Sequence, residues 1–169
     1  LAMVAGLATL NVMDRHQLVQ RAEKYGNLIG EGLRAMQPRF EFLKDVRWRG
    51  CIIGIEFGPP KSLGLKAAWA VAHKMDRSLF PQAAIIPLLE DHHIITQVAG
   101  HHIDVVKLLP PLVVDESDVK WFLDAFEKVM IDMHKFPGPV WEALSRIGIN
   151  ALGGGRTAAK ATEREPVLA

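Results

Sequence analysis

Four histidines are the most concentrated group of potential ligands in the sequence. They form two adjacent pairs, His92–His93 and His101–His102, on either side of a short β candidate. Imidazole is a common zinc ligand, but a zinc site needs three or four converging side chains. Adjacent residues of a strand point to opposite faces, so each pair can offer only one ring to a shared site. The pattern therefore predicts histidines on surface loops or beside a cleft, and no metal ligand.

Two basic side chains are stronger candidates for binding a substrate. Arg47 and Arg49 flank Trp48 at the head of a predicted strand. A guanidinium there can clamp a carboxylate or phosphate, and the indole can stack on a ligand. The alternative for Arg47 is an exposed strand edge, on which the arginine pairs with an acid of the same fold.

Lys107 is the second candidate, because its neighbours in Val105-Val-Lys-Leu-Leu-Pro-Pro-Leu112 are all apolar. A lysine in such a run either points out of the sheet as a surface residue or guards a cleft and binds an anion. Strand alternation places Val105, Lys107 and Leu109 on one face. Lys107 and Arg47 are therefore our candidates for substrate-binding or domain-interface contacts, and a plain surface role remains the alternative for each.

Common catalytic motifs are absent from the sequence. The Gly153–Gly155 run lies near the end of the chain, without the strand before it and the helix after it that a phosphate loop needs. No Gly-x-Ser-x-Gly or Cys-x-x-Cys pattern occurs. On motifs alone we predict no catalytic residue in this chain, and the resemblance described below implies no cofactor-binding residue either.

The composition is that of a single globular domain. The chain has 169 residues, of which 49% are hydrophobic and 23% charged, with a net charge of +1. So small a charge argues against nucleic acid and anionic membranes as partners. Cys51, the only cysteine, lies in an apolar run and is expected to be a buried, reduced thiol in the cytoplasm.

The periodicities predict a small sheet covered by helices, which is an α/β class (an α+β small domain). An apolar helix is expected over Leu1–Val12, and an amphipathic helix from a cap at Asp14 to Pro38. In the second helix we expect Gly26 and Gly30 to permit close packing. Further elements are predicted as strands over 46–57, helices over 63–75 and 80–89, strands over 94–99 and 104–109, and a helix capped by Asp115.

Three segments in series resemble one enzyme family. Leu1–Met13 is similar to the helix that follows the Gly-Gly-Asn-Pro turn in class III (ornithine/acetylornithine-type) pyridoxal-phosphate aminotransferases. Val46-Arg-Trp-Arg-Gly50 followed by Ile53-Gly-Ile-Glu56 resembles the family's Val-Arg-Gly-x-Gly-x-x-x-Gly-Ile-Glu strand. Lys107-Leu-Leu-Pro-Pro-Leu112, with the helix after Asp115, resembles its Arg-x-x-Pro-Pro-Leu segment and final helix.

The resemblance implies the C-terminal small domain of a type I pyridoxal-phosphate transferase fold. It divides the chain into the end of an interdomain helix (1–13), the small domain (14–135), an extra short helix (136–152) and a disordered tail (153–169). The family's Schiff-base lysine, the acid that meets the pyridine nitrogen and most phosphate contacts would precede Leu1. Pyridoxal 5′-phosphate would then be bound by a missing N-terminal large domain, and this chain alone would be inactive. A homodimer is also implied.

The implied reaction is transamination between an amino donor and a keto acceptor. Two departures bear on it: Trp48 replaces a glycine, and Lys107 stands where many members carry an arginine that grips the α-carboxylate. Arginine offers a fork and lysine a single point charge, so an ω-amine or diamine donor is an alternative to an amino acid. An aminomutase, epimerase or decarboxylase of the same fold, and a free-standing binding or interaction module, are the other hypotheses.

Overall fold

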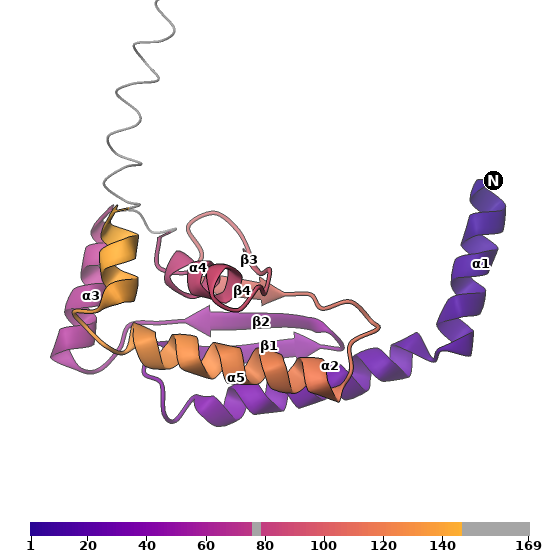
Figure 1. Ribbon diagram of the computed structural model, residues 1–169, viewed down its shortest axis with the longest axis horizontal. Coiled ribbons are helices and arrows are strands. Elements are labelled where there is room, and N and C mark those ends of the chain that lie inside the picture. Colours follow the sequence, from indigo (N-terminus) through magenta and orange to yellow (C-terminus); the bar gives the residue numbers. More distant parts are fainter. Residues whose placement is uncertain (76–78, 147–169) are drawn as a thin grey trace, which may run out of the picture.

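The computed structural model describes residues 1–75 and 79–146 and shows a small antiparallel sheet with helices around it (Figure 1). Along the chain the elements are α1 (Ala2–Arg15), α2 (Leu18–Met36), β1 (Leu43–Arg49), β2 (Ile52–Phe57), α3 (Leu63–Met75), α4 (Gln82–Glu90), β3 (Gln97–Val98), β4 (Val105–Leu108) and α5 (Glu116–Met133). Residues 139–146 are also helical. No helix in the described ranges has the length and apolar character that crossing a membrane requires.

The sheet has strand order β1-β2-β4-β3, and each neighbouring pair is antiparallel. Its two faces differ sharply in burial. Alternate residues of β2, namely Ile53, Ile55 and Phe57, are buried, while Ile52 is 63% exposed. We name the buried side the inner face and the other side the outer face. This alternation confirms the predicted split of β2 between core and surface.

The inner face carries the hydrophobic core. Figure 1 shows α5 running beside α2 along the sheet, and α4 packs against α5. One face of α5 lies in this core, with its buried residues being Val119, Phe122, Ala125, Phe126, Val129, Met130 and Met133. The α5 cap is also as expected: the Asp115 carboxylate accepts from the backbone N–H groups of Ser117 and Asp118. The Asp118 carboxylate accepts in return from the backbone N–H of Asp115, which completes a capping box.

Two glycines let α2 approach the sheet closely. A Cβ atom on Gly26 would overlap with the backbone carbonyl of Gly50, and one on Gly30 would overlap with the ring of Trp48. Gly50 itself has a φ of +53° in the β1–β2 turn, a conformation that favours glycine. The predicted close packing of Gly26 and Gly30 is therefore confirmed.

Cys51, the residue after that turn, is buried as a free thiol, and burial raises its pKa. Its sulfur lies 3.5 Å from the carbonyl oxygen of Ala22, in the same contact between α2 and the turn. The thiol is thus a packing residue with suppressed reactivity, as the apolar run predicted.

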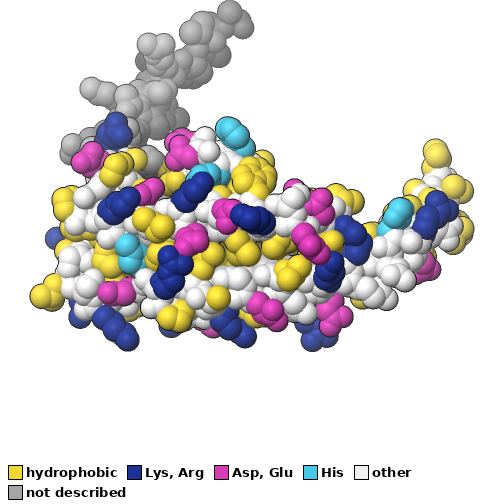
Figure 2. All heavy atoms as spheres, turned by 60° about the horizontal axis from the view of Figure 1, so that its bottom comes forward, with side chains coloured by type: hydrophobic (Ala, Val, Ile, Leu, Met, Phe, Trp, Pro, Cys, Tyr) yellow, Lys and Arg dark blue, Asp and Glu magenta, His cyan; other side chains and the backbone are white. Residues whose placement is uncertain are grey.

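The first helix stands apart from the rest of the domain. α1 has no buried residue, and Figure 1 shows it projecting from the body at the end of α2. Val4, Leu7 and Leu10 are 70%, 64% and 57% exposed. Figure 2 shows hydrophobic side chains gathered toward the free end of this arm.

Some expected boundaries differ from the structure. Asp14 does not cap the second helix: α1 continues through it, and the chain turns at Gln17, whose φ is +48°. The strand expected over 94–99 shrinks to two residues, because only Gln97 and Val98 pair with β4. The extra short helix is present over 139–146, and the predicted tail over 153–169 lies outside the described residues.

A Gly26→Ala substitution should destabilise the domain strongly. The new methyl group would meet the Gly50 backbone, which cannot swing aside as a side chain can, so we expect a loss of about 3 kcal/mol in the free energy of unfolding. Gly64→Ala in α3 is the matched control, since its Cβ would meet nothing within 4 Å. Urea unfolding of both variants tests this, and equal stabilities would contradict the close approach.

His134 should make stability depend on pH. Its Nδ1 lies 2.7 Å from the carbonyl oxygen of Met130, whereas its buried Nε2 has no hydrogen-bond partner among the described residues. Burial lowers the pKa of His134, although the Met130 bond and the charge of Glu41 oppose this. Protonation therefore favours the unfolded chain, so stability should fall as pH drops below about 6.5.

The His134→Phe variant removes the titrating group while keeping an aromatic ring beside Phe40 and Phe42. We expect the melting temperature of this variant to fall less than that of the unaltered chain between pH 7.5 and pH 5.5. Parallel pH profiles for the two proteins would refute a role for His134.

Candidate functional site

The two predicted substrate-binding residues lie on the same face of the sheet. Arg47 pairs directly with Gly54, and Gly54 pairs in turn with Lys107, which pairs with Gln97. Directly paired residues share a face, so these four form a transverse row on the outer face, which we name the outer row. Two strand spacings, about 10 Å, separate the backbones of Arg47 and Lys107.

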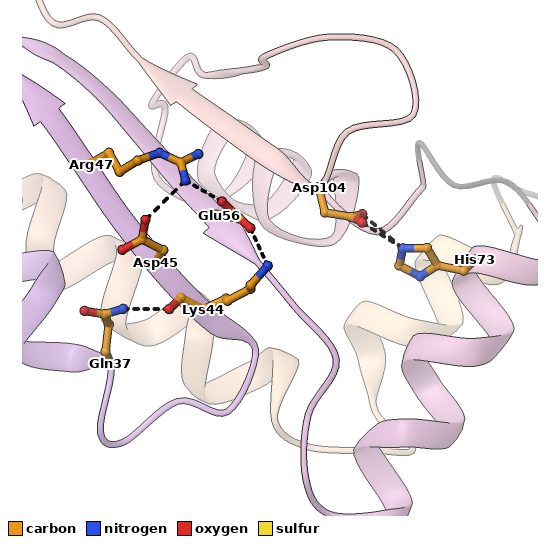
Figure 3. A network of polar contacts seen from close by, with 7 residues as sticks. All are labelled: Gln37, Lys44, Asp45, Arg47, Glu56, His73 and Asp104. Atoms are coloured by element: carbon orange, nitrogen blue, oxygen red, sulfur yellow. Dashed lines mark hydrogen bonds and ion pairs between the residues drawn. The ribbon is translucent and has the colours of Figure 1, made fainter.

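Arg47 is bound by acids of its own sheet. Its Nη1 lies 2.6 Å from Glu56 Oε2 and 3.2 Å from Asp45 Oδ2, and Lys44 Nζ lies 2.6 Å from Glu56 Oε1 (Figure 3). The hydrogen bonds from Lys44 and Arg47 lower the pKa of Glu56, and the contact with Glu56 raises that of Arg47. The positive charge of Arg47 is therefore largely neutralised where it stands.

Lys107 is the half-buried cation of the row. It makes no hydrogen bond or ion pair with another residue in the described part of the chain, whereas Lys44 and Arg47 share the nearby carboxylates. Arg49, on the same side of β1, is exposed. Both carboxylates of the outer face are thus engaged, and the face keeps an excess of positive charge at Lys107.

Trp48 does not line the outer face. Its ring lies over Gly30 on the inner side, its Nε1 donates to Asn27 Oδ1 at 2.9 Å, and the Arg34 guanidinium lies 4.4 Å from the ring centroid. Trp48 therefore does not stack on a ligand beside Arg47, which was one of the possibilities, because alternation sends the two side chains to opposite faces. The indole instead anchors α2 to β1.

The histidine pairs occupy chain reversals. His93 follows α4 and His102 lies in the β3–β4 turn, and each has a φ of +54°. The rings of His101 and His102 lie 3.7 Å apart. Within 1–75 and 79–146, no three His, Cys, Asp or Glu side chains converge as a metal site would require.

A further polar pair joins α3 to the sheet and was not predicted from the sequence. His73 Nε2 lies 3.0 and 3.1 Å from the two carboxylate oxygens of Asp104, directly before β4 (Figure 3). His73 Nδ1 lies 2.9 Å from the carbonyl oxygen of Trp69, and the two rings stack at 4.1 Å. The pair fixes the start of the strand that carries Lys107, but no spacing rule links residues so far apart in sequence.

Superposition on solved structures shows which fold this chain has. The transaminase of the marine bacterium Virgibacillus superimposes with a TM-score of 0.58 at 19% identity, over 75% of this chain and 27% of that one. An Arthrobacter phospholyase, solved with phosphoethanolamine, gives 0.57 at 25% identity over 75% and 28%. The fold is therefore the α/β small domain found in the transaminases that carry pyridoxal phosphate.

The family follows from the sequence comparison. The model named "Aminotransferase class-III" matches residues 1–130. An uncharacterised aminotransferase of Schizosaccharomyces pombe is 30% identical over 151 residues, which is 86% of this chain and 28% of that protein. The chain belongs to the class III aminotransferases, as the three segments predicted. It spans about a quarter of the length of the curated relatives it matches.

Class III aminotransferases generally depend on pyridoxal phosphate, but the described residues do not make a complete site for it. The carboxylates of the outer face, Asp45 and Glu56, are engaged by Lys44 and Arg47, so neither is left to meet a pyridine nitrogen. Lys107 lies in a row of strand residues without a loop of backbone N–H groups beside it to cradle a phosphate. The cofactor does not fit these residues alone.

Proposed function

We propose that this chain is the C-terminal small domain of a pyridoxal-phosphate-dependent aminotransferase and is inactive without a large N-terminal domain. The family match supports the reaction class, and the length of the relatives supports a missing part. In this proposal the large domain binds the cofactor, which withdraws electrons from the substrate carbon that bears the amino group. The amino group then passes from an amino donor to a keto acceptor.

The observation that carries the proposal is the apolar arm formed by α1. A helix that is apolar around its circumference is normally buried, yet α1 buries no residue in this chain. We infer that the arm packs against the large domain, where the end of an interdomain helix belongs. The outer face, with Lys107, then faces the substrate between the two domains. Assembly as a homodimer and a place in the cytoplasm are part of the same proposal.

Two other functions are distinguishable. The Arthrobacter phospholyase favours a reaction of the same fold other than transamination, because that protein was solved with phosphoethanolamine. A binding or interaction module would need no large domain at all. The reading frame upstream of Leu1 separates this module from the enzymes: a segment with a lysine at a strand end and an aspartate for the pyridine nitrogen supports an enzyme. Amino-group transfer by the complete protein then separates transamination from the other reactions.

The isolated chain should associate through the arm. Its exposed apolar side chains lack a cover, so we expect oligomers in light scattering and binding of a hydrophobic dye. Replacing Val4 by Lys and Leu7 by Glu, which leaves the net charge unchanged, should reduce both signals. The control double variant places Lys at Leu63 and Glu at Val113, which are 85% and 77% exposed, and should change neither. A monodisperse, dye-free chain would contradict the arm's proposed role.

Lys107→Arg in the complete protein should change substrate preference. A guanidinium can grip a carboxylate with two parallel hydrogen bonds, so the variant should favour α-amino acid donors over ω-amines by about tenfold in kcat/KM. Lys120→Arg on α5, where Lys120 pairs with Asp124, is the control and should leave both values unchanged. Unaltered donor and acceptor preference in Lys107→Arg would remove Lys107 from the substrate site.

A further inference from the structure

Arg21 joins two segments that lie far apart in the sequence. It stands near the start of α2, and its side chain reaches the linker of residues 109–114 between β4 and α5. Its Nε donates to the carbonyl oxygen of Leu112 at 3.2 Å, and its Nη2 donates to those of Val113 and Val114 at 3.4 and 2.8 Å. One guanidinium, with its donors in a fixed fork, thus binds the carbonyls of three consecutive residues.

The linker needs a partner of this kind because its own sequence removes backbone donors. Pro110 and Pro111 have no N–H group, so the ladder between β2 and β4 cannot continue into them. Val114 N–H donates to the Pro111 carbonyl oxygen at 3.2 Å, and the carbonyls of residues 112–114 turn to Arg21. The linker is therefore held by a side chain of α2 where a strand would be held by its neighbour.

The backbone of Arg21 is bonded to the root of the arm. Its N–H donates to the carbonyl oxygen of Gln17 at 2.9 Å, and Gln17 is the residue at which the chain turns from α1 into α2. Met13 of α1 and Leu112 of the linker border the same open hollow. Arg21 thus contacts the arm junction through its backbone and the linker through its side chain, which connects the arm with the end of β4.

A second contact between α2 and α5 is weaker. Lys24 follows Arg21 by one turn, and its Nζ lies 2.8 Å from Glu116 Oε1 at the start of α5. These two side chains are 55% and 71% exposed, so water screens the pair. Arg21 is half-buried, and its guanidinium lies 5.0 Å from the ring centroid of Tyr25, which helps to hold it in place. Arg21 is therefore the stronger of the two contacts.

We propose that Arg21 is a positioning residue, which fixes the end of β4, and with it Lys107, relative to the arm. Lys107 lies one residue before β4 ends at Leu108, so a shift of the linker would move its backbone. In the proposed function the arm packs against the large domain, and Arg21 then sets where Lys107 lies over that domain. This last step rests on the proposed function, whereas the hold of Arg21 on the linker and the end of β4 does not.

Amide hydrogen exchange in the isotopically labelled 169-residue chain tests this hold. Arg21→Met removes the three hydrogen bonds to the linker and keeps an unbranched side chain, so the amides of Leu108 and Val114 should exchange about tenfold faster. The amide of Val129, in the buried part of α5, should change less, because the opening is local. Arg21→Lys should restore part of the protection, and the control Lys24→Met should exchange like the unaltered chain.

Kinetics of the complete protein test the placement of Lys107. Arg21→Met should raise KM for the amino donor about fivefold and leave kcat nearly unchanged, since Lys107 moves out of register with the substrate. In a Lys107→Met background the same change should not raise KM further, because the group that Arg21 positions is gone. A residue that only stabilises the fold would lower the melting temperature in both backgrounds and leave KM unchanged in both. Lys24→Met should leave KM unchanged.

Two results would overturn the proposal. One is exchange in Arg21→Met that is unaltered at Leu108 and Val114, or faster to the same degree at Val129. The other is an active enzyme in which Arg21→Met leaves KM unchanged or raises it equally with and without Lys107→Met, and this would reject the inference alone. A complete protein without aminotransferase activity would reject the proposed function, while the exchange rates still decide whether Arg21 holds the end of β4.

Discussion

The contact between Gly26 of α2 and the backbone carbonyl of Gly50 constrains the rest of the domain. It sets how closely α2 lies against the β1–β2 turn, and the β1–β2 register decides which residues of the two strands face α2 and the core. Strand side chains alternate, so a slip of one residue would bury Arg47 and expose Val46. The composition of the outer row therefore depends on the same register that turns the apolar residues of β1 and β2 toward α2.

The charged side chains of the outer face are paired on the β1 side and, within the described chain, unpaired at Lys107. Glu56 accepts from both Lys44 and Arg47, which leaves the β1 side balanced. Lys107, one strand further on, has no such partner among the described residues. Because the exposed ion pairs contribute little stability, their main effect here is to decide which cation remains available. Lys107 is thus the cation of the outer row that is left without an acidic partner among the described residues, whereas Arg47 is paired with Asp45 and Glu56.

Sequence reasoning succeeded where one local rule decided the outcome. Alternation in β2 and the capping pattern at Asp115 are properties of a few adjacent residues, and both are found in the structure. It failed at Asp14, where α1 continues to Arg15 and the break between the helices falls at Gln17 instead. It also missed the His73–Asp104 pair, because the two residues lie 31 positions apart and no local pattern links them. The sequence singled out Lys107 and Arg47 as basic side chains in predicted strands. Their position in one row follows from the register of the strands, which the distance between them along the sequence does not reveal.

The arm raises a question of folding as well as of function. An isolated helix of the length of α1 is only marginally stable in water even with favourable residues. Forming its first turn restricts the backbone of several residues, and this loss of entropy exceeds the stabilisation from the first hydrogen bond. α1 also lacks an acidic first turn and a side-chain cap, so local interactions add little to its stability. Its helical form is therefore expected to depend on a surface that covers its apolar residues. Folding of the arm would then be coupled to assembly with the large domain that we propose.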